Sequence, residues 1–475
     1  MLLFLAAVLG ACQNGGENGG EDTPEPTPTP TPTPVPLEGE ATIYVAGPLS
    51  GPDAASGQAQ AAGARLAADQ LNRVGGLQGR RINIETINDF GDPEGAQSAA
   101  EQITEAARSG EDVAGVVTFG GSDPELDSVS GGYLGADGLD SLVVMPASDE
   151  LVTGQVDDER FFQLSAPVVR QAREVAAVMR ERNLKDVALV HSDSEYGRGL
   201  AEEFERSAEE LGVGTAATFE IASGSVTYSD QVTQVREMNP SGLFFAAEDE
   251  EAAVFLSELF GFEFQGSVIG ANKSLSYNLV DRLGCQAEGL SFASVLPSPE
   301  STMSAELLGQ YEEQEGRAPD RHTVAGYSAV EFITRAYAEA GSLDAGAAAG
   351  TARESEIQTL MGNVAFDAQG NLVRPRIHFF QVQGRQLRHQ FTRDVGEAPR
   401  MPEGQQGDGG TLLDLSTEGQ DPIVFAGLDW DSARFANTVA RLIIEAGYGY
   451  PTESTAGSSV PLFQSLRQGD VDVYL

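Results

Sequence analysis

Hydroxyl, carboxylate and amide side chains follow several predicted strands of this chain, close to the points where the strands end. Because the carboxyl ends of parallel strands meet at one edge of a sheet, these groups are expected to gather there. Such groups hydrogen-bond a small polar molecule and balance its charge. In chain order the candidates are Ser122, Ser148, Asp149, Glu248 and Asn272.

Each candidate has a simpler interpretation. Ser122 closes a Gly-Gly-Ser loop after the apolar run 113–119. Together with free N–H groups at a helix N-terminus, its hydroxyl would bind a carboxylate, or it would only cap that helix. Asp149, Glu248 and Asn272 would otherwise be solvated loop residues.

Patterns typical of enzymes are missing from the sequence. There is no G-x-S-x-G motif, Walker loop, or G-x-G-x-x-G after a strand. The histidines lack metal-ligand spacing; they are His191, His322, His378 and His389. We therefore expect binding without catalysis, and neither a metal nor a cofactor.

The stretch 41–93 sets the organisation that must position these side chains. Thr42–Ala46 is apolar and β-branched, and a helix with one apolar face is predicted over 58–74. Gly75-Gly76 ends that helix, and 81–87 supplies the next strand. The alternation of strands and helices continues to about residue 395. It forms two runs, one starting near Ala41 and one near Val187, which predicts an α/β protein with two similar lobes.

The motifs in this span resemble the leucine/isoleucine/valine-type (branched-chain amino acid family) solute-binding proteins of bacterial ABC importers. The resemblance lies in GPLSGP, AADQLNRVGGLQGRRI, ND-x-x-D-P and VALVHSDSEYGRGLAEEF, and it covers 41–395. It implies a type I periplasmic-binding-protein fold, with two doubly wound lobes joined by three crossovers that close on a small solute. The expected lobes are about 41–165 with 291–372, and about 166–290 with 373–395.

The resemblance also implies roles for site residues. Ser122 lies where the family has its carboxylate-binding serine, and Tyr196 matches the tyrosine that packs on the ligand from the second lobe. Tyr196 would otherwise be an ordinary surface or core residue.

Two departures from the family leave the solute open. Ser148 or Asp149 replaces a usual threonine in a segment two residues shorter, and Asn272-Lys273 stands where binders of amino acids carry an acidic residue. A buried ammonium needs an anionic partner. Asp149 or Glu248 would supply this anionic partner from another side of the binding site. Alternatively, the solute has no α-ammonium group, since relatives also bind amides, urea-like molecules and aromatic acids.

The N-terminus predicts a membrane anchor. MLLFLAAVLGAC is too short to span a bilayer, and Leu9–Cys12 matches the bacterial lipobox, in which Cys12 would be lipidated. An ordinary signal peptide is the alternative. Residues 13–40 are a Gly/Asn/Glu and Thr/Pro-rich segment expected to be a disordered tether.

Net charge excludes several partners. The chain has 72 acidic and 29 basic residues and a net charge of −43, which argues against nucleic acid and against anionic lipid surfaces. No apolar stretch reaches transmembrane length, so the lipid is the expected membrane attachment. We expect a monomer.

The C-terminal part begins with a Gly/Gln-rich linker over 396–420. The motifs DWDSARFANTVARLIIEAGYGYP and SSVPLFQSLRQGDVDV in 421–475 resemble the start of a glycine betaine/choline-type binding domain. Relatives continue well beyond this unit, so we expect an incomplete α/β fragment from a truncated record or a prematurely ended gene.

Together these features predict an extracytoplasmic, lipid-anchored receptor that delivers a small polar solute to an ABC permease and its ATPase. The alternative is a ligand-sensing module that passes its closure to a signalling partner. The lack of a transmembrane or cytoplasmic signalling segment in the sequence favours transport.

Overall fold

The computed structural model describes residues 37–51, 53–119, 127, 129–135, 139–148, 156–262 and 264–395, together with two C-terminal strands. Cys12, Ser122, Asp149, the linker and residues 13–36 of the predicted tether lie outside the described residues. The chain divides into two compact units, Met1–Pro399 and Arg400–Leu475. In the second unit β15 (Ile423–Gly427) pairs in parallel with β16 (Thr452–Ala456).

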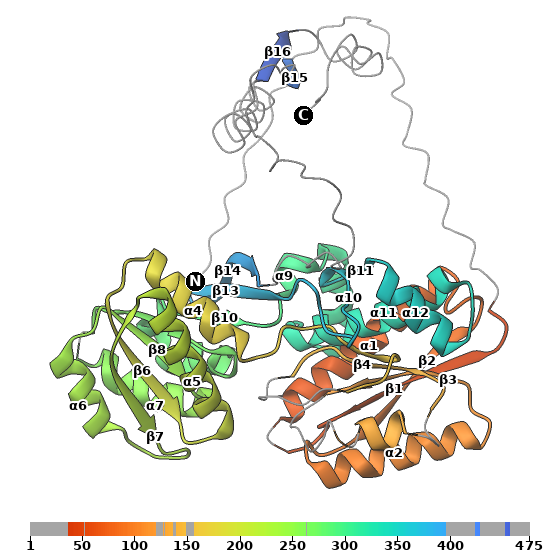
Figure 1. Cartoon of the computed structure of the whole chain (residues 1–475), viewed down its shortest axis with the longest axis horizontal. Coiled ribbons are helices and arrows are strands. Elements are labelled where there is room, and N and C mark those ends of the chain that lie inside the picture. The colour runs from red at the N-terminus through yellow and green to blue at the C-terminus, as the bar shows by residue number, and fades with distance from the viewer. Residues whose placement is uncertain are drawn as a thin grey trace, which may run out of the picture. The chain divides into compact units, whose positions relative to one another are not determined.

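The first lobe is built on a five-stranded parallel sheet in the order β2-β1-β3-β4-β5 (Figure 1). The central strands are apolar and buried on both faces, as strands covered by helices on both sides must be. Their bounds are β1 (Glu40–Gly47), β2 (Arg81–Asn88), β3 (Val113–Thr118), β4 (Leu142–Met145) and β5 (Phe161–Gln163).

Helices cover both faces of this sheet. Alternate residues along each strand point to opposite faces, so each face carries apolar side chains that a helix covers. Ile43 and Val117 pack with α1 and α11, whereas Tyr44 and Val116 pack with α2 on the other face. The helices and the π-helical turn η1 of this lobe are α1 (Ala54–Arg73), α2 (Pro93–Arg108), η1 (Val129–Tyr133), α9 (Pro299–Thr302), α10 (Ala305–Glu315), α11 (Arg321–Ala340) and α12 (Ala345–Glu354).

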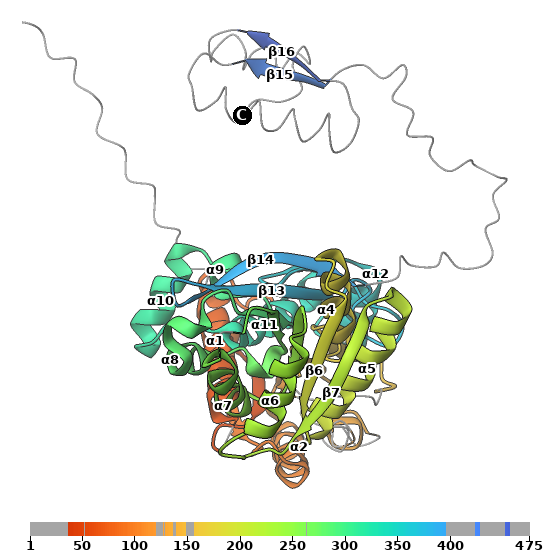
Figure 2. The same ribbon diagram turned by 90° about the vertical axis from the view of Figure 1, so that its left-hand side faces the viewer.

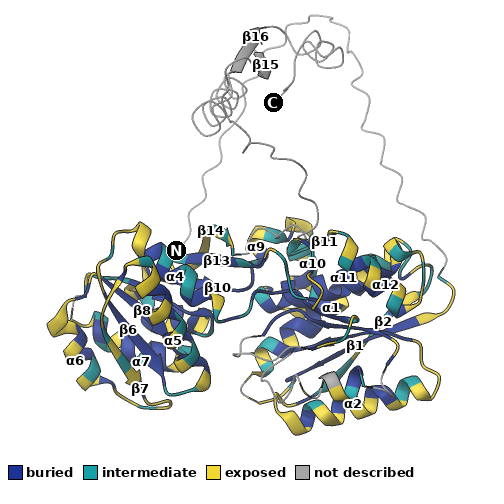
Figure 3. Ribbon diagram, viewed as in Figure 1, coloured by how far each residue is buried: buried dark blue, intermediate teal, exposed yellow. Residues whose placement is uncertain are grey.

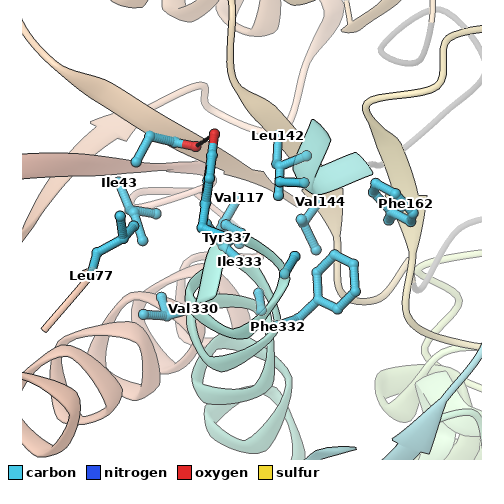
Figure 4. Close-up of a cluster of buried hydrophobic side chains, with 14 of the residues drawn as sticks. Ile43, Leu77, Val117, Leu142, Val144, Phe162, Val330, Phe332, Ile333 and Tyr337 are labelled. Atoms are coloured by element: carbon cyan, nitrogen blue, oxygen red, sulfur yellow. Dashed lines mark hydrogen bonds between the residues drawn. The ribbon is translucent and has the colours of Figure 1, made fainter. Parts of the chain in front are cut away.

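α11 anchors the first lobe through its apolar face and one polar contact. Phe332 and Ile333 lie in the core beneath the sheet, and the Tyr337 hydroxyl donates to the Ala114 carbonyl at 2.8 Å (Figure 4). α11 also contacts α1 backbone to backbone, which glycine permits. A Cβ on Gly326 would lie 2.0 Å from the Gln60 carbonyl oxygen.

The second lobe holds a seven-stranded sheet in the order β14-β13-β10-β9-β8-β6-β7. Pairing is parallel except where β13 joins β10 and β14. The strands are β6 (Asp186–Ser192), β7 (Gly214–Ile221), β8 (Gly242–Ala246), β9 (Ser267–Gly270), β10 (Ser291–Ser294), β13 (Arg376–Gln383) and β14 (Gln386–Asp394).

Two groups of helices cover this second sheet from opposite sides (Figure 2). One group consists of α4 (Arg170–Glu181) and α5 (Glu195–Leu211); the other consists of α6 (Ser229–Met238), α7 (Asp249–Phe260) and α8 (Tyr277–Leu283). Short 3₁₀ turns, η2 (Asn272–Ser274) and η3 (Gly284–Ala287), flank α8. The central strands of both sheets are buried, while the outward faces of helices such as α2 and α6 are exposed (Figure 3).

The chain passes between the lobes three times: after β5, after β10 and before β13. The predicted lobe boundary at 291 is wrong, because β10 pairs with β9 and β13 of the second sheet and the return follows Ser294. β11 (Ile357–Thr359) and β12 (Gly362–Val364) form a separate two-stranded antiparallel sheet. The otherwise predicted α/β architecture is confirmed. No helix in the described ranges is both long enough and apolar enough for a membrane span.

Candidate functional site

Each lobe has a point where the strand order reverses, with β1 between β2 and β3, and β6 between β7 and β8. Connections leave such a pair of strands toward opposite faces, so a crevice opens outside their carboxyl ends. In the second lobe Ser194 follows β6 and Glu248 follows β8. These two side chains therefore lie at the crevice where open α/β sheets bind ligands.

The Glu248 carboxylate is held at one oxygen only. The Ser194 hydroxyl donates to Oε1 at 3.1 Å and lies 2.7 Å from the Ser192 hydroxyl. Oε2 is shielded from solvent and has no hydrogen-bond partner among the described residues. Leaving a buried acceptor unpaired costs roughly 1–3 kcal/mol or more for a charged group. Glu248 is thus suited to accept a hydrogen bond from an N–H or ammonium group of a bound molecule.

The start of α5 fixes this arrangement. Ser194 caps the helix by accepting from the Gly197 N–H at 3.1 Å. A Cβ on Gly197 would lie 2.5 Å from both the carbonyl oxygen and the hydroxyl of Ser192, so glycine is needed for this close approach. The Gly197 N–H and the close approach of Gly197 to Ser192 thereby orient the Ser194 hydroxyl that holds Glu248.

Tyr196 and Asn272 contact each other directly. The Tyr196 hydroxyl donates to Asn272 Oδ1 at 2.8 Å and accepts from the Lys273 N–H at 3.2 Å. Gln171 of α4 completes the network, because its Nε2 donates to Asn272 Oδ1 and its Oε1 accepts from the Asn272 N–H at 2.9 Å. The network fixes the η2 turn at the carboxyl end of β9.

Tyr196 is 1% exposed, and the Lys273 ammonium lies 4.9 Å from its ring centroid. A cation over an aromatic face is attracted to the ring quadrupole. Tyr196 therefore supports the Asn272 turn in this structure, and its contact with a solute stays a prediction.

Arg321 connects the two lobes at this turn. It is the first residue of α11, which packs against α1 and the first sheet. Its guanidinium donates to the carbonyls of Leu275 at 2.6 Å and Asn272 at 3.2 Å, both at the η2 turn of the second lobe.

A cavity of about 220 Å³ lies beside this contact, between residues of both lobes. A water takes roughly 30 Å³ of liquid volume, so the cavity has room for a small molecule. The first lobe contributes Ala55 and Ser56 of α1 and His322 of α11; the second contributes Leu275, Tyr277 and Phe380.

The structure describes only part of the predicted set, and a solute contact of any of these residues stays a prediction. Ser148 is described and is 4% exposed after β4, whereas Ser122 and Asp149 fall outside the described residues. Sequence reasoning missed Gln171, Ser194 and Arg321. A serine three residues before Gly197 is a recognisable helix cap, but no sequence signal marks the other two.

Comparison with known proteins decides the family. The family model described as "Periplasmic binding protein" matches residues 40–386, most of the chain. The chain belongs to the periplasmic binding protein family. A second model, "Substrate binding domain of ABC-type glycine betaine transport system", matches 421–475, where the sequence has the corresponding resemblance.

Curated relatives of this binding protein carry the names expected from its motifs. It is 27% identical over 346 residues to "Leu/Ile/Val-binding protein homolog 3" of Brucella melitensis, covering 72% of this chain and 91% of that protein. It is 28% identical over 345 residues to "Leu/Ile/Val-binding protein BraC3" of Rhizobium johnstonii, covering 70% and 89%. The resemblance to leucine/isoleucine/valine-type binding proteins is confirmed.

Solved structures show the same fold. The substrate binding protein LivJ of Streptococcus pneumoniae, in complex with isoleucine, matches with a TM-score of 0.62 and 18% identity over 75% of this chain and 99% of that chain. The leucine binding protein LivK of Thermotoga maritima matches with a TM-score of 0.60 and 18% identity, over 74% of this chain and 99% of that chain. The predicted type I periplasmic-binding-protein fold is confirmed.

Proposed function

We propose that this protein is a lipid-anchored extracytoplasmic receptor that captures a small polar solute between its lobes and delivers it to an ABC importer. The observation that carries the solute site is the Glu248 carboxylate at the switch point of the second sheet, with one oxygen held by Ser194 and the other buried without a partner among the described residues. Family membership supports the transport role. In this proposal Cys12 carries the lipid.

The proposed mechanism is closure around the solute. A solute that contacts both lobes favours the closed arrangement by its differential affinity for that state. Glu248, with the Asn272 turn, forms the second-lobe wall. Ser122, Ser148 and Asp149 are the first-lobe partners in this proposal.

Glu248 points to a solute with an ammonium or N–H donor. A buried carboxylate interacts most favourably with a charged donor, because such charge-assisted hydrogen bonds are about twice as strong as neutral ones. The relatives are named for leucine, isoleucine and valine. We therefore place amino acids first in the solute class, ahead of amides and urea-like molecules.

The test is a thermal-shift screen of the full chain against amino acids, amides, ureas and aromatic acids, followed by calorimetry of each hit. For an amino acid, Glu248→Gln is expected to weaken binding about tenfold or more, because roughly 1.4 kcal/mol corresponds to a factor of ten.

Glu209→Gln is the matched control, since Glu209 is exposed on α5. It is expected to leave the affinity unchanged. Equal affinities of Glu248→Gln and the unsubstituted protein would refute the assigned site, and the absence of any hit would refute the proposed solute class.

A further inference from the structure

A second, much smaller cavity lies where the three crossovers meet. Its volume is about 20 Å³. Leu164, Ser165 and Ala166 of the first crossover line it, with Val295 of the second and the 372–376 segment of the third. Because the lobes turn about these crossovers, the cavity lies at the pivot of the molecule.

The lining carries positive charge and an unsatisfied hydroxyl. Ser165 is 2% exposed, and its Oγ has no hydrogen-bond partner among the described residues. Arg374, Arg376 and His378 also line the cavity, and its lining contains no carboxylate. Burying a hydroxyl without a partner is unfavourable.

The second arginine is already partly engaged. Arg376 Nε lies 3.3 Å from Asp394 Oδ1, and its Nη1 donates to the Met361 carbonyl at 3.0 Å. Among the described residues Arg374 lines the cavity and takes part in no ion pair, so its guanidinium is not neutralised by a carboxylate there. Arg374 lines the cavity and is also exposed to solvent.

His378 contributes polarity rather than charge. Its Nδ1 lies 2.9 Å from the Thr392 hydroxyl. Burial lowers the pKa of His378 to about 3, and the neighbouring His389 and Arg376 act in the same direction. The ring is therefore neutral near pH 7.

The size and the charge of the cavity together restrict its occupant. A cavity needs roughly 10–15 Å³ to hold one water, so this one accommodates a single water or a monatomic ion. Two arginines and an unpartnered hydroxyl in the lining, with no carboxylate among the lining residues, favour a negative occupant over a neutral one. We propose that the pivot cavity binds one small anion of the size of chloride, held by Ser165 and Arg374.

Such an anion would tie the crossovers together. All three crossovers contribute residues to the cavity wall. An arrangement of the lobes that keeps this wall intact therefore binds the anion best, and the bound anion in turn stabilises that arrangement. The site therefore couples the anion concentration to the opening and closing of the lobes.

The experiment uses the full chain. Crystals soaked in sodium bromide are expected to show an anomalous peak in contact with Ser165 and Arg374. In solution, replacing gluconate by chloride at constant ionic strength is expected to raise the melting temperature saturably by about 1–3 °C. Arg374→Gln is expected to abolish this rise in melting temperature. Ser165→Ala is expected to weaken the rise, and it serves as the test if Arg374→Gln folds poorly.

Arg65→Gln is the control, since Arg65 is exposed on α1. It is expected to retain the chloride effect. An ordered water without anomalous signal would overturn the proposal. A bromide peak together with an equal chloride effect in Arg374→Gln and the unsubstituted protein identifies an adventitious ion and overturns it as well.

Discussion

His378 and Asp89 are buried titratable side chains whose pKa shifts change stability in opposite directions. Burial lowers the pKa of His378 from 6.5 to about 3. Burial raises the pKa of Asp89 from 3.8 to about 6, against a hydrogen bond from the Gly91 N–H. The stability from neutral His378 is present above pH 6.5 and is lost as the pH falls toward 3. The stability from protonated Asp89 is present below pH 3.8 and is lost as the pH rises through 6.

We predict that His378→Asn removes one of these dependences. The unfolding free energy of the unsubstituted protein minus that of the variant should rise with pH below 6.5, by up to about 1.4 kcal/mol per pH unit. Urea unfolding between pH 4.5 and 7 in gluconate, which keeps the pivot cavity free of chloride, measures it. Asp89→Asn should give a slope of the opposite sign, and a pH-independent difference for His378→Asn would contradict the assignment.

Which single residues form the site could be predicted only in part. Glu248 and Asn272 were found because they follow strands, and Tyr196 because a family motif contains it. Gln171 lies 101 residues from Asn272, its hydrogen-bond partner. Periodicity along a helix indicates which face is buried, but it does not indicate which distant side chain that face meets.

At the scale of elements, the contact between α1 and α11 limits what side chains the first lobe tolerates. A Cβ on Gly326 would lie 2.0 Å from the Gln60 carbonyl oxygen, and one on Gly63 would lie 2.0 Å from the Thr323 carbonyl oxygen. Both obstacles are backbone atoms, so relief requires the helices to separate. Close helix packing here depends on the two glycines.

Gly326→Ala is therefore predicted to lower the unfolding free energy by about 2–4 kcal/mol, as overpacking of a core does. Gly350→Ala in α12 is the matched control, because nothing lies within 4 Å of its added Cβ. That substitution should stabilise the protein by about 0.5–1 kcal/mol through helix propensity. Thermal or urea unfolding measures the stability of both variants. Equal stability of the two variants would contradict the prediction, because it would mean that α1 and α11 accommodate the added methyl group without loss of stability.

The elements that could be predicted are those with a clear apolar pattern. The helix expected over 58–74 is α1 (Ala54–Arg73), and the strand expected over 81–87 is β2 (Arg81–Asn88). β14 was missed because its sequence, QLRHQFTRD, lies at a sheet edge with mostly exposed side chains and has little apolar signal. Residue type alone also misleads for Cys285, because a free cysteine usually packs as a small core residue, whereas Cys285 is exposed on η3.

At the scale of the whole molecule, alternation of strands and helices predicts two doubly wound lobes but not where the chain crosses between them. A crossover is defined by which strands pair, and pairing depends on partners distant in sequence. β10 illustrates this, because its pairing with β13 joins residues about ninety positions apart. The predicted lobe boundary at 291 failed at that strand.

The division at Pro399 leads to the last prediction. Residues up to Pro399 form a compact unit that contains both sheets and the candidate site. A chain ending at Pro399 should therefore bind the same solute with the same affinity as the full chain. Its calorimetric unfolding should coincide with the main transition of the full chain, because the core that unfolds is the same. A melting temperature several degrees lower in the shorter chain would mean that residues 400–475 stabilise the binding unit, and the two units would then not be energetically independent.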